Sequence, residues 1–144
     1  MAPVTPELAL ESSSTSGPHL VWTAAADNAK YQVERKAKGG DWTLVRTTEE
    51  IAYTDVTAKM GETYAYRVRA EVDGEPGEYS NELSFQFNPF ADVSGKKTIE
   101  YVAWAFNNGI TKGTSATTFA PNADCIRVQL VVFLYKYNGI YNVI

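Results

Sequence analysis

The chain offers few of the side chains that usually catalyse reactions. Its 144 residues include one histidine, His19, and one cysteine, Cys125. A hydrolase triad would need His19 as its base, yet no nucleophile elbow of the Gly-x-Ser-x-Gly type lies near it. Cys125 has no histidine or basic pair close to it in sequence, so we expect a small buried residue rather than an activated thiolate.

Carboxylates and metal ligands are also poorly placed for chemistry. The acidic residues fall mostly in turns, such as Glu49 and Glu50, or on the solvent-facing sides of expected strands. Nothing there would raise the pKa of a carboxyl group, as a glycosidase requires. One histidine and one cysteine cannot form an internal disulfide or a cluster with metal-ligand spacing. No glycine-rich loop suited to phosphate is present. The sequence therefore predicts no enzyme, no metal and no cofactor.

Charge and hydropathy argue against two further classes of partner. The chain has 13 basic and 17 acidic residues and a net charge of -4, which gives no electrostatic footprint for nucleic acid. No stretch approaches the roughly 18 consecutive apolar residues of a membrane span, and the start lacks a signal-peptide pattern. We therefore expect neither nucleic-acid binding nor membrane insertion, and an export signal upstream in a longer parent protein.

Residues 1–87 show the alternation of an all-β domain. β-branched and aromatic residues recur at every second position between clusters of Gly, Pro, Asn and Ser. Turn signals stand at residues 16–18, 27–28, 39–40 and 73–74. Seven strands are expected, at Leu8–Leu10, Leu20–Trp22, Tyr31–Lys36, Thr43–Arg46, Ala52–Thr54, Tyr64–Glu71 and Glu82–Phe87. Seven short strands indicate a two-sheet sandwich.

The same alternation predicts which side chains fill the core. Tyr31 and Val33 share one face of their strand, and Trp22 is expected to fill the space between the sheets. In the strand at 64–71, Arg67 and Arg69 are expected to face water. The inward set of that strand is then Tyr64, Tyr66, Val68 and Ala70.

Five segments carry a more specific pattern, at 20–22, 31–35, 53–55, 61–70 and 77–82. Their order and spacing resemble the fibronectin type III family, over nearly all of residues 4–87. The resemblance implies an immunoglobulin-like sandwich, in which Tyr64 takes the place of the tyrosine-corner residue. The Arg-Gly-Asp attachment tripeptide of that family is absent, so integrin binding is not expected.

In residues 88–144 the spacing of apolar residues changes to that of helices. Apolar residues follow helical spacing at Ile99, Val102, Ala103 and Phe106. Asn108 and Gly109 then predict the end of the helix, because glycine readily adopts the left-handed conformation found there. A second helix is expected from Cys125 or Ile126 to Tyr137. The loop between the two helices is predicted to hold two buried side chains, Ile110 and Phe119. The segment is therefore expected to be a helix-loop-helix unit.

This second segment resembles an S-layer homology repeat over residues 89–139. The matching pieces are 90–93, 102–105, 108–113, 119–122, and Arg127 with Gln129. The resemblance implies non-covalent docking of exported proteins onto secondary cell-wall polymers of Gram-positive-type bacteria. It also implies the polymer-binding residues, which are Arg127, Trp104, Lys112, Gly113 and Asp92.

Each of these residues also has a simpler interpretation. Arg127 offers a guanidinium fork matched to carboxylate or phosphate, or it is a solvated arginine at a helix start. Trp104 is a core or interface residue, or a platform for a sugar ring. Lys112 is a solvated loop residue or a ligand. Asp92 either contacts a ligand or caps the helix that follows it.

The segment departs from the family in two ways. Where the family has Thr-Arg-Ala-Glu, this chain has residues 126–129 with Ile126 first, which cannot cap the second helix and costs about 1 kcal/mol unless Asp124 caps instead. Family members commonly carry three repeats, and this chain shows one. A lone helix pair cannot bury both of its apolar sides, so we expect packing on the sandwich or on copies of itself, as a homo-oligomer.

The sequence thus predicts an all-β fibronectin type III sandwich at 1–87 and a small helical S-layer homology repeat at 88–144. The expected function is that of a non-catalytic fragment of an exported bacterial protein at the cell surface. The repeat would contribute to wall attachment, and the sandwich would be a spacer or an interaction module for other surface proteins. In the alternative, the single repeat no longer binds wall and serves folding or assembly.

Overall fold

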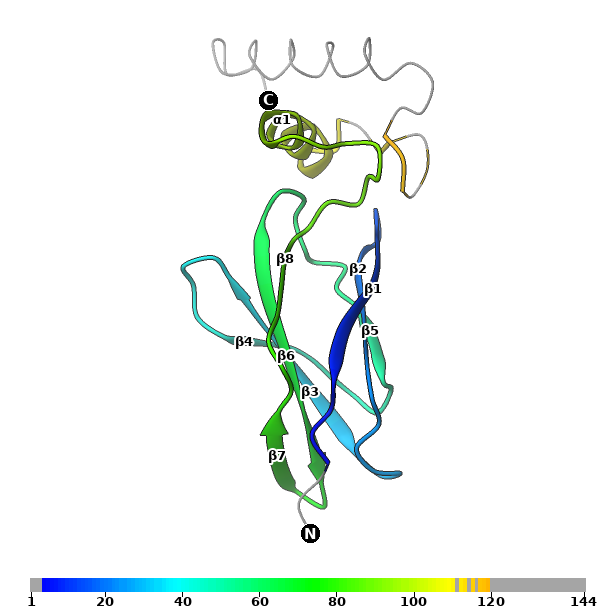
Figure 1. Ribbon diagram of the computed structural model, residues 1–144, viewed down its shortest axis with the longest axis vertical. Helices are drawn as coiled ribbons and strands as arrows, with labels where there is room; N and C mark the ends of the chain where they lie inside the picture. Colours follow the sequence, from blue (N-terminus) through cyan, green and yellow to red (C-terminus); the bar gives the residue numbers. More distant parts are fainter. Residues whose placement is uncertain (1–3, 111, 114, 116, 120–144) are drawn as a thin grey trace.

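The structure is a computed structural model that describes residues 4–110, 112, 113, 115 and 117–119. Among these residues, two antiparallel sheets face each other (Figure 1). The three-stranded sheet has the order β1 (Leu8–Ser14), β2 (Gly17–Trp22) and β5 (Ala52–Thr54). The five-stranded sheet contains β4 (Thr43–Thr48), β3 (Lys30–Ala37), β6 (Thr63–Val72), β7 (Glu75–Tyr79) and β8 (Leu83–Gln86).

The expected core lies between these sheets. Tyr66, Val68 and Ala70 of β6 are fully buried, and Tyr64 is 5% exposed. Tyr31 and Val33 of β3 face the same interior, where the Trp22 ring packs against the Tyr31 ring with centroids 5.7 Å apart. The predicted inward set and the sandwich are therefore confirmed.

β7 is the strand that the sequence pattern misses. Pro76 and Gly77 interrupt the alternation there, but proline is tolerated on a sheet edge because it need not donate to a neighbour. β6 is long enough to pair with two strands in succession: Thr63–Tyr66 pair with β8, and Arg69–Val72 pair with β7. Two short strands thus share one edge of β6.

The turn expected at residues 16–18 is displaced. Gly17 and Pro18 already belong to β2, and the turn consists of Thr15 and Ser16. Gly17 has a φ of 133°, and a Cβ at this position would overlap the backbone carbonyl of Asp55. Glycine is therefore required by a close approach of two chain segments as well as by its φ.

Tyr64 forms the tyrosine corner that the family resemblance implies. Its hydroxyl accepts a hydrogen bond of 2.9 Å from the backbone N–H of Lys59, five residues earlier. This bond fixes the chain as it enters β6.

We expect Tyr64→Phe to lower the free energy of unfolding by about 1 kcal/mol, because the ring stays buried while the Lys59 N–H loses its acceptor. Urea unfolding followed by fluorescence measures this change. An unfolding midpoint equal to that of the wild type would contradict a stabilising role for this hydroxyl.

The second segment begins with the predicted helix. α1 (Lys96–Asn107) ends where expected, with Gly109 at a φ of 73°. The Ile110 N–H donates to the Ala105 carbonyl at 2.8 Å, and the Gly109 N–H donates to the Phe106 carbonyl at 3.1 Å. This pair of hydrogen bonds is the Schellman motif, which ends the helix.

The second expected helix, from Cys125 or Ile126 to Tyr137, lies outside the described residues, as do Arg127 and the capping positions around it. No helix in the described part of the chain is long and apolar enough to cross a membrane. The division of the chain at residue 88 stays a prediction.

Candidate functional site

α1 lies against one end of the sandwich, opposite to β7 in Figure 1. The contact centres on Met60, which stands in the loop that leads into β6. Its side chain is 1% exposed and joins a cluster of buried residues contributed by the second segment. Those residues are Phe90, Val93, Val102, Ala103, Ala105 and Phe119.

Asn107, at the end of α1, stabilises the same contact with two hydrogen bonds. Its Nδ2 donates to the Met60 carbonyl at 3.0 Å, and its Oδ1 accepts from the Met60 N–H at 3.0 Å. Both backbone groups of a buried residue are thereby satisfied by one side chain. A Cβ at Gly61 would stand 3.0 Å from the Ala103 Cβ, so glycine allows the close approach of the loop to α1. Packing on the sandwich, the first of the two expected packing partners, is confirmed for α1 and the described loop residues.

A cleft of about 450 Å³ runs along this contact. Met60 and Ala103 contribute apolar surface, and Trp104 lines the cleft from α1. Charged or amide side chains stand around it, from Glu62, Gln86, Lys96, Glu100 and Asn107. The volume of the cleft falls within the range of small-ligand sites, but its lining is more polar than is usual for them. The half-buried Trp104 is thus a wall of the cleft as well as a packing residue against the buried cluster.

Asp92 and Gly113 lie around a different feature, the aromatic pair of Phe90 and Phe119. Their ring centroids are 5.7 Å apart, and Phe119 is fully buried. Gly113 has a φ of 79°, and a Cβ there would stand 2.5 Å from the Phe90 ring and 2.6 Å from the Thr118 carbonyl. Its place in the family pattern therefore has a packing explanation.

Asp92 does not cap α1, so that interpretation was wrong. Its Oδ1 accepts a 2.8 Å hydrogen bond from the Phe119 N–H, which ties the start of the segment to the end of its loop. The helix N-cap is Gly95, which makes no side-chain hydrogen bond. Asp92 stands three positions before Gly95, and its carboxylate accepts a hydrogen bond from the loop instead.

Asn88 also orders this region, although no pattern in the sequence singled out its side chain. Its Nδ2 donates to the Val93 carbonyl at 2.8 Å, and its Oδ1 accepts from the Phe90 N–H at 3.0 Å. The prediction of a buried Ile110 was wrong, because this side chain is 38% exposed just after the helix stop. Of the two loop side chains predicted to be buried, only Phe119 is buried.

The remaining predicted site residues are separated or undescribed. Lys112 is exposed and is absent from the described lining of the cleft. Arg127 lies outside the described residues. The structure thus brings Asp92 and Gly113 to one aromatic pair and Trp104 to the cleft.

Asp55 is the most buried polar group described in the sandwich. It is 0% exposed and receives hydrogen bonds from Arg35 at 2.8 Å and from the Tyr66 hydroxyl at 2.6 Å. Thr57 donates twice more, from its hydroxyl at 2.7 Å and its backbone N–H at 3.1 Å. Burial alone would raise the pKa of Asp55, but the hydrogen bonds from Thr57, Tyr66 and Arg35 and the charge of Arg35 lower it.

The same network shifts the pKa of its partners. Burial, followed by the hydrogen bond to Asp55, raises the pKa of Tyr66 well above 10.0. The sequence analysis singled out Asp55 only as part of the family pattern. A lone Asp after a strand carries no signal of burial, because the groups that satisfy it come from β3 and β6.

His19 is part of a short polar chain on the other sheet. Its Nδ1 is 2.6 Å from the Thr54 hydroxyl, and its Nε2 is 3.9 Å from a Glu11 carboxylate oxygen. The order of groups is that of a catalytic triad, but the distance to Glu11 is too long for a hydrogen bond. The side chains of His19 and Glu11 are 35% and 61% exposed, so the site does not exclude water.

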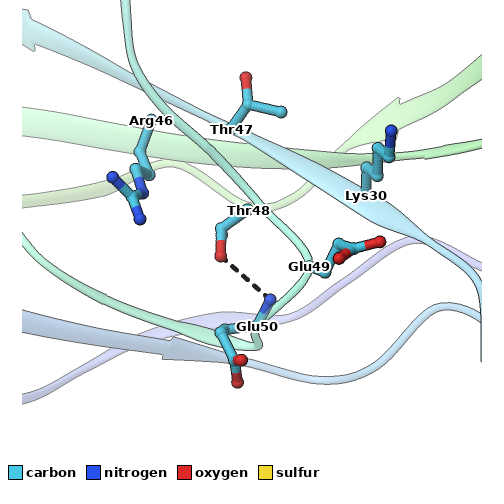
Figure 2. Close-up of a pocket in the computed structure, with 6 residues that line it drawn as sticks. All are labelled: Lys30, Arg46, Thr47, Thr48, Glu49 and Glu50. Carbon is cyan, nitrogen blue, oxygen red and sulfur yellow. Dashed lines mark hydrogen bonds between the residues drawn. The ribbon is translucent and has the colours of Figure 1, made fainter.

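A second pocket of about 500 Å³ lies where β3 and β4 meet the following turn (Figure 2). Glu49 and Glu50 are exposed there, as expected, and the Glu50 N–H donates to the Thr48 hydroxyl at 3.0 Å. In Figure 2, Arg46 and Lys30 point in different directions from opposite sides of the turn. The polar groups do not converge on one point, so the pocket lacks the arrangement of a specific site.

Comparisons with known proteins give a family match for the second part of the chain and a fold for the first part. Residues 89–130 match the family model of the S-layer homology domain. The N-terminal part has the fold of fibronectin type III domains. A human fibronectin type III domain superposes with a TM-score of 0.54 at 19% identity, covering 66% of this chain and 95% of its own.

Two further solved structures contain a part with the same fold. The twitchin kinase region from C. elegans gives a TM-score of 0.55 at 18% identity and covers 62% of this chain, and domains A168–A170 of titin give 0.53 at 24% identity and cover 59%. The chain spans 17% and 32% of these two structures. No curated protein sequence matched the chain.

The chain thus combines a sandwich of the fibronectin type III fold with an S-layer homology domain. The S-layer homology domain places it among cell-surface, cell-wall-associated proteins. Domains of both kinds are typically non-catalytic; the kinase named in the twitchin region is a separate part of that protein.

Proposed function

We propose that the chain is a non-catalytic attachment fragment, in which the helical repeat contributes to binding an anionic cell-wall polymer. The observation that carries the proposal is the S-layer homology match at residues 89–130, which includes Arg127. A guanidinium can pair with a carboxylate or phosphate through two parallel hydrogen bonds. Asp92 and Gly113 support this role indirectly, because they order the loop that precedes Arg127.

The sandwich would then be a spacer or an interaction module. Its tight contact with α1 through Met60 and Asn107 would hold it in a fixed orientation on the repeat in either role. The cleft beside Trp104 lies at this same contact, so it is the described surface best suited to take part in polymer binding.

The test is sedimentation of the full chain with purified Gram-positive cell walls. We expect Arg127→Ala to weaken binding about tenfold, the loss of roughly one charge-assisted contact. Arg46→Ala is the matched control, because it removes an equal charge from an exposed position on the sandwich. No sedimentation of the wild type, or equal losses in both variants, would contradict the proposal.

A second candidate function is purely structural. The sandwich residue Met60 sits within the buried cluster of the repeat, so the repeat also completes a fold. Two results together would favour this alternative. The wild-type chain would stay in solution when the walls are sedimented, and the repeat would unfold when Met60 is truncated.

A further inference from the structure

The outer face of the five-stranded sheet carries a stack of alternating cations and aromatic rings. In spatial order, this stack, here named the ladder, is Lys36, Trp42, Arg67, Tyr79 and Arg69. The Arg67 guanidinium lies between two rings, 4.2 Å from the Trp42 centroid and 3.8 Å from the Tyr79 centroid. Lys36 and Arg69 extend the stack at 5.0 Å from Trp42 and 4.9 Å from Tyr79.

Hydrogen bonds hold the ladder in place. Arg67 donates twice to one Glu34 oxygen, at 2.8 and 2.7 Å, and Tyr79 donates to the other at 3.0 Å. Arg69 donates from Nε to the Gln32 amide oxygen at 2.8 Å. The side chains of Arg67, Tyr79 and Arg69 have therefore already lost the freedom that binding would otherwise remove, which lowers the cost of complex formation.

The ladder carries donors that its own network does not use. Lys36 and the terminal nitrogens of Arg69 have no hydrogen-bond acceptor among the described residues. The three cations share the face with two carboxylates, Glu34 and, beyond Gln32, Glu71, whose Oε2 accepts from the Gln32 amide at 3.4 Å; the cations are thus in local excess in a chain whose net charge is -4. The face is thus a local positive surface on an acidic protein, complementary to acidic groups.

The composition of this face is that of a protein interface. Trp, Tyr and Arg are the residues most enriched among interface positions that dominate binding energy. Leu44 pairs with Glu34 across β3 and β4, so it lies on the same face, and it is 56% exposed. A rigid cationic and aromatic surface with an exposed leucine beside it suits a polypeptide that carries both acidic and apolar side chains.

We propose that the ladder is a docking surface for an acidic segment of another protein. Partner carboxylates would bind Arg69 and Lys36, and an apolar partner side chain would cover Leu44. The inference rests on the interaction-module role proposed for the sandwich, and it is independent of wall attachment.

The test titrates the full chain with poly-L-glutamate at low salt and follows backbone amide shifts by NMR. We expect saturable shifts confined to β3, β4, β6 and β7, and about tenfold weaker binding for Arg69→Gln. Lys36→Gln is the second variant, because Arg69 also supports the sheet. Lys97→Gln removes the same charge from an exposed position on α1 and is the matched control.

Several outcomes would overturn the proposal. These are no saturable shifts, shifts spread over the whole surface, or equal weakening by Arg69→Gln and Lys97→Gln. Preferential binding of polygalacturonate over poly-L-glutamate at the ladder would assign the face to a saccharide instead. Each of these results is separable from wall sedimentation, which tests Arg127.

Discussion

Replacing Asp55 with alanine is expected to lower the free energy of unfolding by about 3–5 kcal/mol. The substitution leaves the buried Tyr66 hydroxyl and the Arg35 guanidinium without their shared acceptor. The backbone N–H and the hydroxyl of Thr57 lose theirs as well. Guanidinium chloride unfolding measures the loss. Asp27→Ala, at an exposed turn, is the control and should change stability by no more than about 0.5 kcal/mol.

The Asp55 network also predicts the direction of a pH dependence. Because the folded-state pKa lies below the usual 3.8, the ionised carboxylate stabilises the fold above that value. The stabilisation is lost as the pH falls below 3.8 and through the lower folded-state pKa. The difference in stability between the wild type and Asp55→Asn should therefore narrow from pH 7 to pH 2. A difference that stays constant over this range would contradict ionisation as its cause.

Met60→Ala is expected to cost about 2–5 kcal/mol, the usual range for truncating a buried methionine. The cavity would open within the buried cluster of the second segment, although Met60 belongs to the loop before β6. Hydrogen exchange should therefore show α1 losing protection before the strands of the sandwich do.

Val56→Ala is the matched control for this experiment. Val56 stands in the same loop but is 72% exposed, so its truncation should leave α1 protected. Loss of protection in the sandwich alone after Met60→Ala would show that the repeat does not depend on the sandwich for its core.

Local sequence patterns were sufficient for most of the strands and for α1. Alternation in β6 identified its buried side directly, because one face of an antiparallel strand meets the core and the other meets water. Asn108 and Gly109 marked the helix end because few residues accept a left-handed conformation. The same logic failed at β7, where an edge position tolerates Pro76 and hides the strand from pattern analysis.

The candidate site was less accessible from the sequence. Trp104 was recognised from the family resemblance, but its place on the cleft depends on Met60 and Gly61, which are about 40 residues away in sequence. One of the two interpretations of Asp92 was a helix cap, because Asp92 stands before α1, whereas its carboxylate accepts a hydrogen bond from the Phe119 N–H. Side-chain partners of this kind are set by long-range packing, which local spacing does not encode.

The sequence by itself determined the two kinds of secondary structure, their order and the buried faces, because side-chain periodicity follows from strand and helix geometry. Only the tertiary structure decided that Met60 completes the core of the repeat, that Asp55 is a buried and satisfied carboxylate, and that the ladder is a continuous stack. These features join residues from separate elements, so they exist only once the chain has folded.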